Sequence, residues 1–232
     1  VDLLETLNNP IYKIASCEIT DIPLIEYVAS KNKPIIISTG VSTLEDIVLA
    51  IETCKKMGNN DIAILKCTSG YPAPISEANL RMIEEFSDRF GIVSGLSDHT
   101  LGIISPIVAV AKGAKIIEKH FILDKTIGGP DADFSLDESE FTQMVKAVRE
   151  AEIVLGEVDY NLTNKQLIGR EFSRSLYINE DVKKGDVVTD LNVRSVRPGY
   201  GLHPKYLSDI LGKKFKNDQK KGTRVSLDLF NF

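Results

Sequence analysis

The stretch IVSGLSDHTLGIISPIVAVAKGAKIIEKHF, residues 92–121, contains the pattern that decides the fold. Its two ends, Ile92–Ser97 and Lys115–Phe121, are short apolar runs rich in Ile, which is typical of strands buried on both faces. Between them, Ile103–Lys112 is apolar at helical spacing and ends at Gly113. A strand, a helix and a second strand in this order predict parallel strands with a helix packed outside them.

The same alternation recurs along the first two thirds of the chain. Further strands are expected at Tyr12–Ser16, Pro34–Thr39 and Ile62–Thr68. Further helices are expected at Thr43–Met57, opened by the capping pair Ser42 and Glu45, at Glu77–Phe90 before Gly91, and at Glu138–Leu155, opened by Asp137 and Glu140. Polar residues follow every predicted strand, at the end where a barrel of parallel strands keeps its active site. An open sheet is the alternative, but no G-x-G-x-x-G turn follows any strand.

The pattern of the sequence changes after about Asn164. Short strand-like pieces and turn signals replace long helices, which predicts a small β-rich domain. Within it, VKKGDVVTDLNV at 182–193 resembles QKKGTRVSLDLF at 219–230. The expected organisation is a barrel part at 1–158, a linker at 159–171 and the small domain at 172–232.

Composition narrows the class of protein. The chain has 232 residues and a net charge of -5, which argues against nucleic acid or an anionic membrane as the main partner. No apolar run approaches the ~20 residues of a membrane span. The three cysteines form no C-x-x-C and are odd in number, which favours free thiols and a cytoplasmic location.

Two histidines stand at the ends of neighbouring predicted strands. His99 follows the strand at 92–97, and His120 shares a face with Glu118 because strand side chains alternate. Adjacent strands lie ~4.8 Å apart, so both imidazoles can reach one cation. Two nitrogen ligands leave positions open for water and substrate, and the metal is open among Mn, Co, Zn and Mg. The alternatives are hydrogen-bonding or acid–base histidines.

Seven motifs in order give a family resemblance: YKIASCE, IIISTG, KCTSGYPAP, GLSDHT, IEKHF, GGPDADFSL and RPGYG. Together they resemble the sialic acid synthase family, whose members condense phosphoenolpyruvate with an N-acylated amino sugar. The resemblance implies an α/β fold: an eight-stranded (β/α)8 TIM barrel, of which this chain matches strands four to eight, followed by an antifreeze-protein-like SAF domain. Three further strand–helix units, roughly 90 to 110 residues, are then expected before Val1.

The resemblance also assigns roles to individual residues. The phosphoenolpyruvate contacts are expected to be Lys13, Ser16, Ser38 and Ser97, and the metal ligands His99 and His120. The sugar contacts are expected to be Ser69, Tyr71, Asp131 and Arg197, and the catalytic carboxylates Glu18 and Glu118. The metal is expected to be manganese, alternatively magnesium or cobalt. Lys13 and Ser16 are out of phase for one strand, so the strand must end or bulge near Ala15.

The implied reaction forms a carbon–carbon bond. Carbon 3 of phosphoenolpyruvate attacks the open-chain aldehyde of the sugar, water adds to carbon 2, and phosphate leaves by C–O cleavage. Ser69, PDADFSL and RPGYGLHPKYLSDILGKK resemble pseudaminic acid synthases, whose sugar is a 2,4-diacetamido-2,4,6-trideoxy-hexose of the altrose type. Phe134 is then expected to pack on a methyl group. N-acetylneuraminate and legionaminate synthesis are the alternatives within the family.

Two other classes compete with this reading. A 3-deoxy-sugar-acid phosphate synthase would share the barrel, but the SAF-like domain with RPGYG argues against it. A non-catalytic binding protein would be favoured if the chain were complete as given, because the catalytic set would lack its first-strand members. The resemblance further implies a domain-exchanged homodimer, in which Arg197 reaches a neighbouring subunit's substrate; a salt-bridged loop arginine is the alternative.

Overall fold

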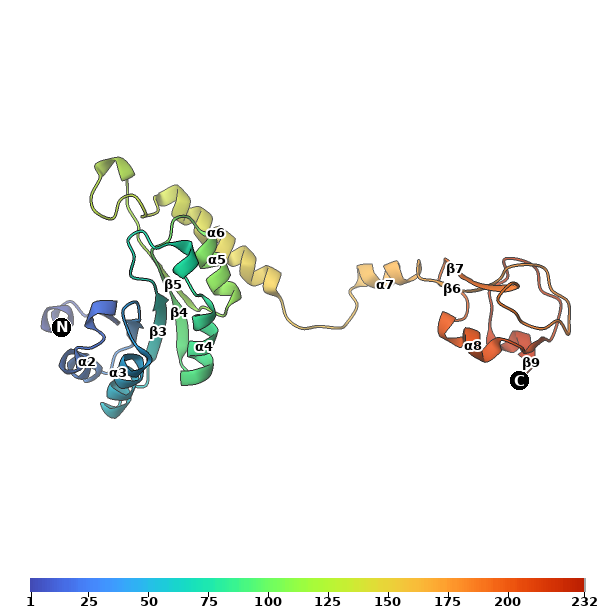
Figure 1. The fold of residues 1–232 in the computed structure, drawn as a ribbon, viewed down its shortest axis with the longest axis horizontal. Coiled ribbons are helices and arrows are strands. Elements are labelled where there is room, and N and C mark those ends of the chain that lie inside the picture. The colour runs from blue at the N-terminus through green and yellow to red at the C-terminus, as the bar shows by residue number, and fades with distance from the viewer. Residues whose placement is uncertain (232) are drawn as a thin grey trace. The chain divides into compact units, whose positions relative to one another are not determined.

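The computed structural model describes residues 1–231, and the chain divides into two compact units, Val1–Glu157 and the chain from Val158 onward. The first unit is built around one parallel sheet (Figure 1). Its strands are β1 Tyr12–Ile14, β2 Ile35–Ser38, β3 Ile62–Cys67, β4 Val93–Asp98 and β5 Ile116–Lys119. They pair in the order β1-β2-β3-β4-β5, all parallel. The predicted α/β class is confirmed, and the sequential order is that of a barrel, with no switch point of the open doubly wound type.

The sheet curls strongly. In a flat sheet β1 and β5 would lie about 19 Å apart, four steps of ~4.8 Å. Yet Nζ of Lys13 on β1 lies 3.7 Å from Oε2 of Glu118 on β5. Both side chains therefore point into the concave face of a partial barrel, to which this chain contributes five strands.

Six helices accompany the sheet. They are α1 Asp2–Thr6, α2 Ile22–Ala29, α3 Leu44–Lys56, α4 Arg81–Phe90, α5 Ile104–Ala111 and α6 Glu138–Leu155. The largest core joins β1, β2 and β3 to the apolar faces of α2 and α3, where Ile25 and Ala50 are fully buried. α5 and α6 lie side by side (Figure 1). The sequence reading had no helix at α1 or α2.

The helix ends test the capping predictions. Asp137 and Glu140 form the predicted capping box of α6, and Gly91 ends α4 in the left-handed region at φ 63°. The predicted pair at α3 was wrong by one residue. Thr43 is the N-cap, since its side chain accepts from the Asp46 N–H while the Asp46 carboxylate accepts from the Thr43 N–H. Serine and threonine are both favoured N-caps, so the sequence alone did not separate Ser42 from Thr43. The helix predicted at 77–90 begins only at Arg81, after a 3-10 turn at Ile75–Glu77.

The second unit is small and rich in short strands. β6 Ser175–Ile178 and β7 Val193–Val196 pair antiparallel, as do β8 Lys214–Phe215 and β9 Phe230–Asn231. Its helices are α7 Asn164–Arg170, inside the expected linker, and α8 Leu207–Ile210. Phe215 and Phe230 are fully buried in its core, with ring centroids 5.3 Å apart.

The two copies of the near-repeat in the second unit contact each other reciprocally. Lys183 pairs with Asp218 at 2.8 Å, and Lys220 pairs with Asp181 at 2.7 Å. Each aspartate also accepts a backbone N–H from the residue after its lysine. The two Lys-Lys-Gly turns are thus held together by symmetric contacts.

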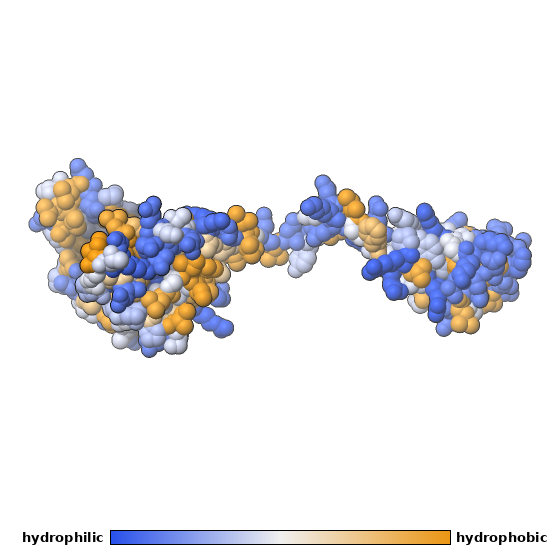
Figure 2. All heavy atoms as spheres, turned by 90° about the horizontal axis from the view of Figure 1, so that it is seen from above, coloured by the Kyte–Doolittle hydropathy of each residue, from blue (hydrophilic) through white to orange (hydrophobic). Residues whose placement is uncertain are grey.

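Apolar side chains reach the surface at several places (Figure 2). The run from the end of α6 into the following segment is the most exposed: Ile153 79%, Val154 84%, Val158 89% and Tyr160 93%. Among the described residues, no helix combines the length and the apolar character that crossing a membrane requires.

Candidate active site

Three predicted residues from three strands meet in the concave face. Ser97 and Glu118 stand opposite each other in the β4–β5 register, and Ser97 Oγ donates to Glu118 Oε1 at 2.6 Å. Lys13 lies 3.7 Å from the other carboxylate oxygen. The Glu118 carboxylate therefore connects two groups that the sequence assigned to a phosphate.

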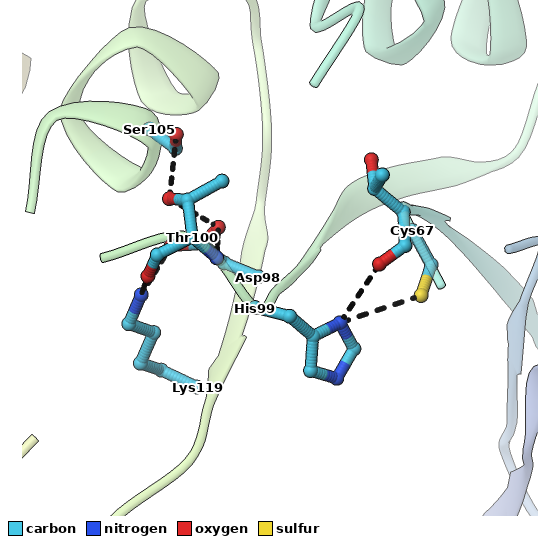
Figure 3. A network of polar contacts seen from close by, with 7 residues as sticks. Cys67, Asp98, His99, Thr100, Ser105 and Lys119 are labelled. Atoms are coloured by element: carbon cyan, nitrogen blue, oxygen red, sulfur yellow. Dashed lines mark hydrogen bonds and ion pairs between the residues drawn. The ribbon is translucent and has the colours of Figure 1, made fainter. Parts of the chain in front are cut away.

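The two histidines face each other one step further along the strands. His99 follows β4 and His120 follows β5, and their ring centroids are 5.1 Å apart. His99 Nδ1 lies 3.2 Å from the carbonyl of Thr68, and Figure 3 also shows its contact with the Cys67 sulfur, at 3.8 Å. A carbonyl only accepts, so Nδ1 carries the proton and the Nε2 lone pair remains available.

Burial and charge shift the pKa of both imidazoles. Burial lowers the pKa of His120, and the neighbouring charge of His99 lowers it further. Burial acts in the same direction on His99, but its contact with the Cys67 sulfur raises the pKa of His99 above its ordinary value. The neutral form of His120 is therefore favoured, and neutral imidazole is the form that binds metal.

Aromatic rings lie against both histidines. Phe134 is 2% exposed and packs on His120 with ring centroids 4.9 Å apart. The Tyr71 ring lies 4.4 Å from the His99 ring, tilted by 59°, and stays 58% exposed. These rings thus cover Phe134 in this structure, and Phe134 itself contacts the imidazole of His120. Tyr71 is the exposed member of this group of rings.

A second cluster lies at the ends of β1, β2 and β3. β1 ends at Ile14 and a 3-10 turn begins at Ser16, so the predicted strand end near Ala15 is confirmed. Ser16 Oγ accepts the N–H of Gly40 at 2.9 Å. Ser38 is 2% exposed and its hydroxyl has no hydrogen-bond partner. A buried hydroxyl without a partner is costly, and a ligand oxygen is one group that would satisfy it.

Gly40 is required by this crowding. A Cβ at Gly40 would lie 2.2 Å from Ser69 Oγ, 2.8 Å from Ser16 Oγ and 2.9 Å from Cys67 Sγ. Ser69, a predicted sugar contact, therefore lies against the same loop as the predicted phosphate contacts.

The remaining predicted residues are placed as follows. Asp131 Oδ2 lies 3.7 Å from His120 Nδ1. The Glu18 carboxylate accepts the N–H of Ala15 at 2.8 Å and is exposed. Arg197 belongs to the second unit, is exposed, and forms no ion pair within residues 1–231.

The sequence assigned no role to several residues of this region. They are Gly40, Cys67, Thr68, Asp98 and Lys119. Gly40 had a signal, since it directly follows two polar residues at a strand end. Asp98 and Lys119 also had one: each directly precedes a candidate metal ligand and carries a charge opposite to the other.

The donor set around the histidine pair determines what kind of metal site it can form. Within the part of the chain that the structure describes, no group of three or more His, Cys, Asp or Glu side chains is arranged to hold a metal ion. Two facing imidazoles, one fixed in its tautomer by Thr68, fit a cation that keeps other positions for water or substrate. They do not make a closed structural site.

All three cysteines are free. Burial acts to raise the pKa of the Cys67 thiol, but contacts with His99 and Ser16 lower it below its ordinary value. Cys54 lies apart from the site, and burial raises its pKa to about 11.

Known proteins similar to this chain share both units. The model of the NeuB family matches residues 1–160, and that of the SAF domain matches residues 173–230. A pseudaminic acid synthase of Helicobacter pylori is 44% identical, covering 98% of this chain and 67% of the relative. One of Campylobacter jejuni is 46% identical, covering 96% and 65%. The chain thus spans about two thirds of the length of these relatives.

The chain is also similar to proteins other than pseudaminic acid synthases. An N,N'-diacetyllegionaminic acid synthase of Legionella pneumophila is 38% identical over 97% of this chain and 65% of the relative. The crystal structure of the spore coat polysaccharide biosynthesis protein SpsE of Bacillus subtilis aligns with a TM-score of 0.65 at 33% identity, covering all of this chain and 70% of that one. The sialic acid synthase resemblance is confirmed: this chain belongs to the NeuB family and carries a SAF domain.

Proposed function

We propose that the protein condenses phosphoenolpyruvate with a 2,4-diacetamido-2,4,6-trideoxy-hexose of the altrose type and water, giving pseudaminic acid and phosphate. The observation that carries the proposal is the meeting of Lys13, Ser97 and Glu118 beside the facing pair His99 and His120. The likeness to pseudaminic acid synthases at 44% and 46% identity supports the choice of sugar.

The phosphate of phosphoenolpyruvate is proposed to bind between β1, β2 and β4. Lys13 supplies one ammonium, and Ser16, Ser38 and Ser97 supply hydroxyl donors, which suits a group with several anionic oxygens. The unpartnered hydroxyl of Ser38 supports this assignment, because a ligand oxygen would satisfy it. Gly40 keeps the loop close enough for its N–H to meet Ser16.

The sugar is proposed to bind over His99 and His120. Members of the NeuB family generally use a divalent metal, and here the two imidazoles would hold it; manganese is proposed, with magnesium or cobalt as alternatives. When bound, such a cation supplies a Lewis acid for the aldehyde oxygen. Tyr71, Ser69 and Asp131 line the same region and are proposed to contact the sugar.

Bond making is proposed to follow from this placement. Carbon 3 of phosphoenolpyruvate attacks the aldehyde carbon, water adds to carbon 2, and the C–O bond to phosphate breaks, so phosphate carries away the electron pair. Glu118, released from Lys13 and Ser97 when phosphate occupies them, is proposed to hold a proton or orient the water. Glu18 is the second proposed carboxylate; its hydrogen bond to Ala15 would have to open for it to reach the sugar.

The choice of sugar is tested by competition. The full-length enzyme is offered phosphoenolpyruvate with N-acetylmannosamine, the legionaminate precursor or the diacetamido-altrose, and kcat/KM is compared. A pocket that pairs particular amide and hydroxyl groups rejects analogues that leave them unpaired, so we expect a preference of about a hundredfold or more for the diacetamido-altrose. Equal turnover of N-acetylmannosamine refutes the pseudaminate proposal, and no turnover of any sugar favours a binding protein.

We further propose a domain-exchanged homodimer in which Arg197 acts on a neighbouring subunit's substrate. The exposed apolar side chains of Ile153 and Val154 at the end of α6 suit a surface covered in an assembly. Arg197 lines a cavity of about 350 Å³ with Arg194 and Lys221 and no acidic residue, which suits an anion. Mixing Arg197→Ala with His99→Ala protein should restore activity through mixed dimers; no restoration after verified subunit exchange argues against the proposal.

A further inference from the structure

The outer face of β4 and β5 carries a buried ion pair. Lys119 Nζ lies 2.7 Å from Asp98 Oδ2, and the two side chains are 0% and 2% exposed. The two residues stand opposite each other in the β4–β5 register. No other ion pair within residues 1–231 is buried to this degree.

Every polar atom of this pair is engaged (Figure 3). Asp98 Oδ1 accepts from the N–H of Thr100 at 3.0 Å and from its hydroxyl at 2.8 Å. Lys119 also donates to the Thr100 carbonyl, and the Thr100 hydroxyl meets Ser105 Oγ on α5 at 2.9 Å. The network therefore joins the ends of β4 and β5 to the first turn of α5.

The position of the pair relates it to the histidines. Strand side chains alternate, so Asp98 and Lys119 point outward while the next residue of each strand, His99 or His120, points inward. Replacing a buried ion pair by apolar residues of similar size is often neutral for stability. A contribution to stability is therefore a weak explanation for this ion pair. A role in fixing the distance between the two strand ends explains it directly.

We infer that Asp98 and Lys119, joined by Thr100, are positioning residues that hold His99 and His120 at the separation a divalent cation requires. The inference rests on the metal site proposed above. It makes the affinity for the cation depend on two side chains that touch neither cation nor substrate.

The test uses the full-length protein and Mn²⁺ alone, with bound and free ion distinguished by electron paramagnetic resonance. The double variant Asp98→Leu with Lys119→Met removes both charges and keeps most of the buried volume. We expect its Mn²⁺ affinity to fall about tenfold or more, as for partners behind metal ligands, while its affinity for phosphoenolpyruvate without metal stays unchanged. Lys119→Arg, which keeps the charge, should lose less.

Controls separate positioning from general loss of stability. Ile25→Ala opens a cavity in the α2 core far along the chain from the site and should leave Mn²⁺ binding unchanged. If the double variant does not fold, Thr100→Val decides, since it removes only the hydroxyl between Asp98 and Ser105 and should still weaken Mn²⁺ binding severalfold.

Each outcome bears on the inference. Wild-type Mn²⁺ affinity in the folded double variant, or in Thr100→Val where only that variant folds, overturns it and leaves the metal site standing. An equal loss in Ile25→Ala overturns it as well, because the effect is then general. A wild-type protein that binds no Mn²⁺ overturns the metal site and the inference together.

Discussion

Replacing Glu118 by glutamine should strengthen the binding of phosphoenolpyruvate while slowing the reaction. Without ligand, the Glu118 carboxylate holds two of the four proposed phosphate contacts: it accepts from Ser97 at 2.6 Å and lies 3.7 Å from Lys13. Phosphate must displace it from both. The Glu118→Gln side chain keeps an acceptor for Ser97 but loses the negative charge, so it competes less well with phosphate.

The magnitude follows from these two contacts. A hydrogen bond to a charged group contributes ~1.5–3 kcal/mol and one between neutral groups about 1 kcal/mol, so the change at Ser97 is about 1 kcal/mol. The ion pair to Lys13 adds little, because its side chains are 34% and 43% exposed and such pairs contribute ~0–1 kcal/mol. A total of about 1 to 2 kcal/mol corresponds to roughly 5- to 30-fold tighter binding.

Calorimetry on the full-length enzyme, without sugar or metal, measures the Kd for phosphoenolpyruvate directly. Glu52→Gln, an exposed charge on α3, is the matched control and should change nothing. In turnover assays, kcat of Glu118→Gln should fall about a hundredfold, as for loss of a proton-transfer group. Weaker binding of phosphoenolpyruvate by the variant would refute the reasoning, since the carboxylate would then help to hold the ligand.

Three shorter predictions follow from the same structure. Ser38→Ala should raise the Tm of the ligand-free enzyme by about 2–4 °C, because an unsatisfied buried hydroxyl is removed, yet raise KM for phosphoenolpyruvate; an unchanged KM contradicts the phosphate role. Gly40→Ala should weaken phosphoenolpyruvate binding at least tenfold with the circular dichroism spectrum retained, since its Cβ would collide with three side-chain atoms. Asp181→Asn with Asp218→Asn should destabilise the SAF domain at pH 7 and progressively less as the pH falls below about 4. Hydrogen bonds from Lys220 and Lys183 lower the pKa of these aspartates in the fold, so their contribution is present above about pH 4 and lost as pH falls through the folded values; a difference in Tm independent of pH contradicts this.

The fold was predictable where one local pattern decided the element. All five expected strands exist, with ends shifted by at most two residues, because Ile-rich runs between helices have few alternatives. α2 was missed because it follows β1 after only a brief turn. The capping error at α3 arose where adjacent Ser42 and Thr43 offered equivalent hydroxyls.

The candidate site was predictable along a strand and much less so across the sheet. Alternation places Glu118 and His120 on one face, and the sequence is sufficient for that. The contact of Lys13 with Glu118 depends on the curl of the sheet, which no local pattern encodes. The burial of Phe134 likewise depends on three rings from different segments.

A ligand can replace the side-chain contacts on the inward face of β4 and β5, but not those on the outward face. The inward contacts of Glu118 are partly exposed and weak enough for phosphate to replace. The outward contact of Asp98 with Lys119 is closed to water and fully hydrogen-bonded, so no ligand reaches it. Because the tripeptides SDH and EKH alternate between these faces, the inward-pointing Ser97 and Glu118 should change substrate affinity. The outward-pointing middle residues should change metal affinity through the histidines that follow them. The same pair of short sequences thus specifies both the exchangeable contacts and the fixed distance between them.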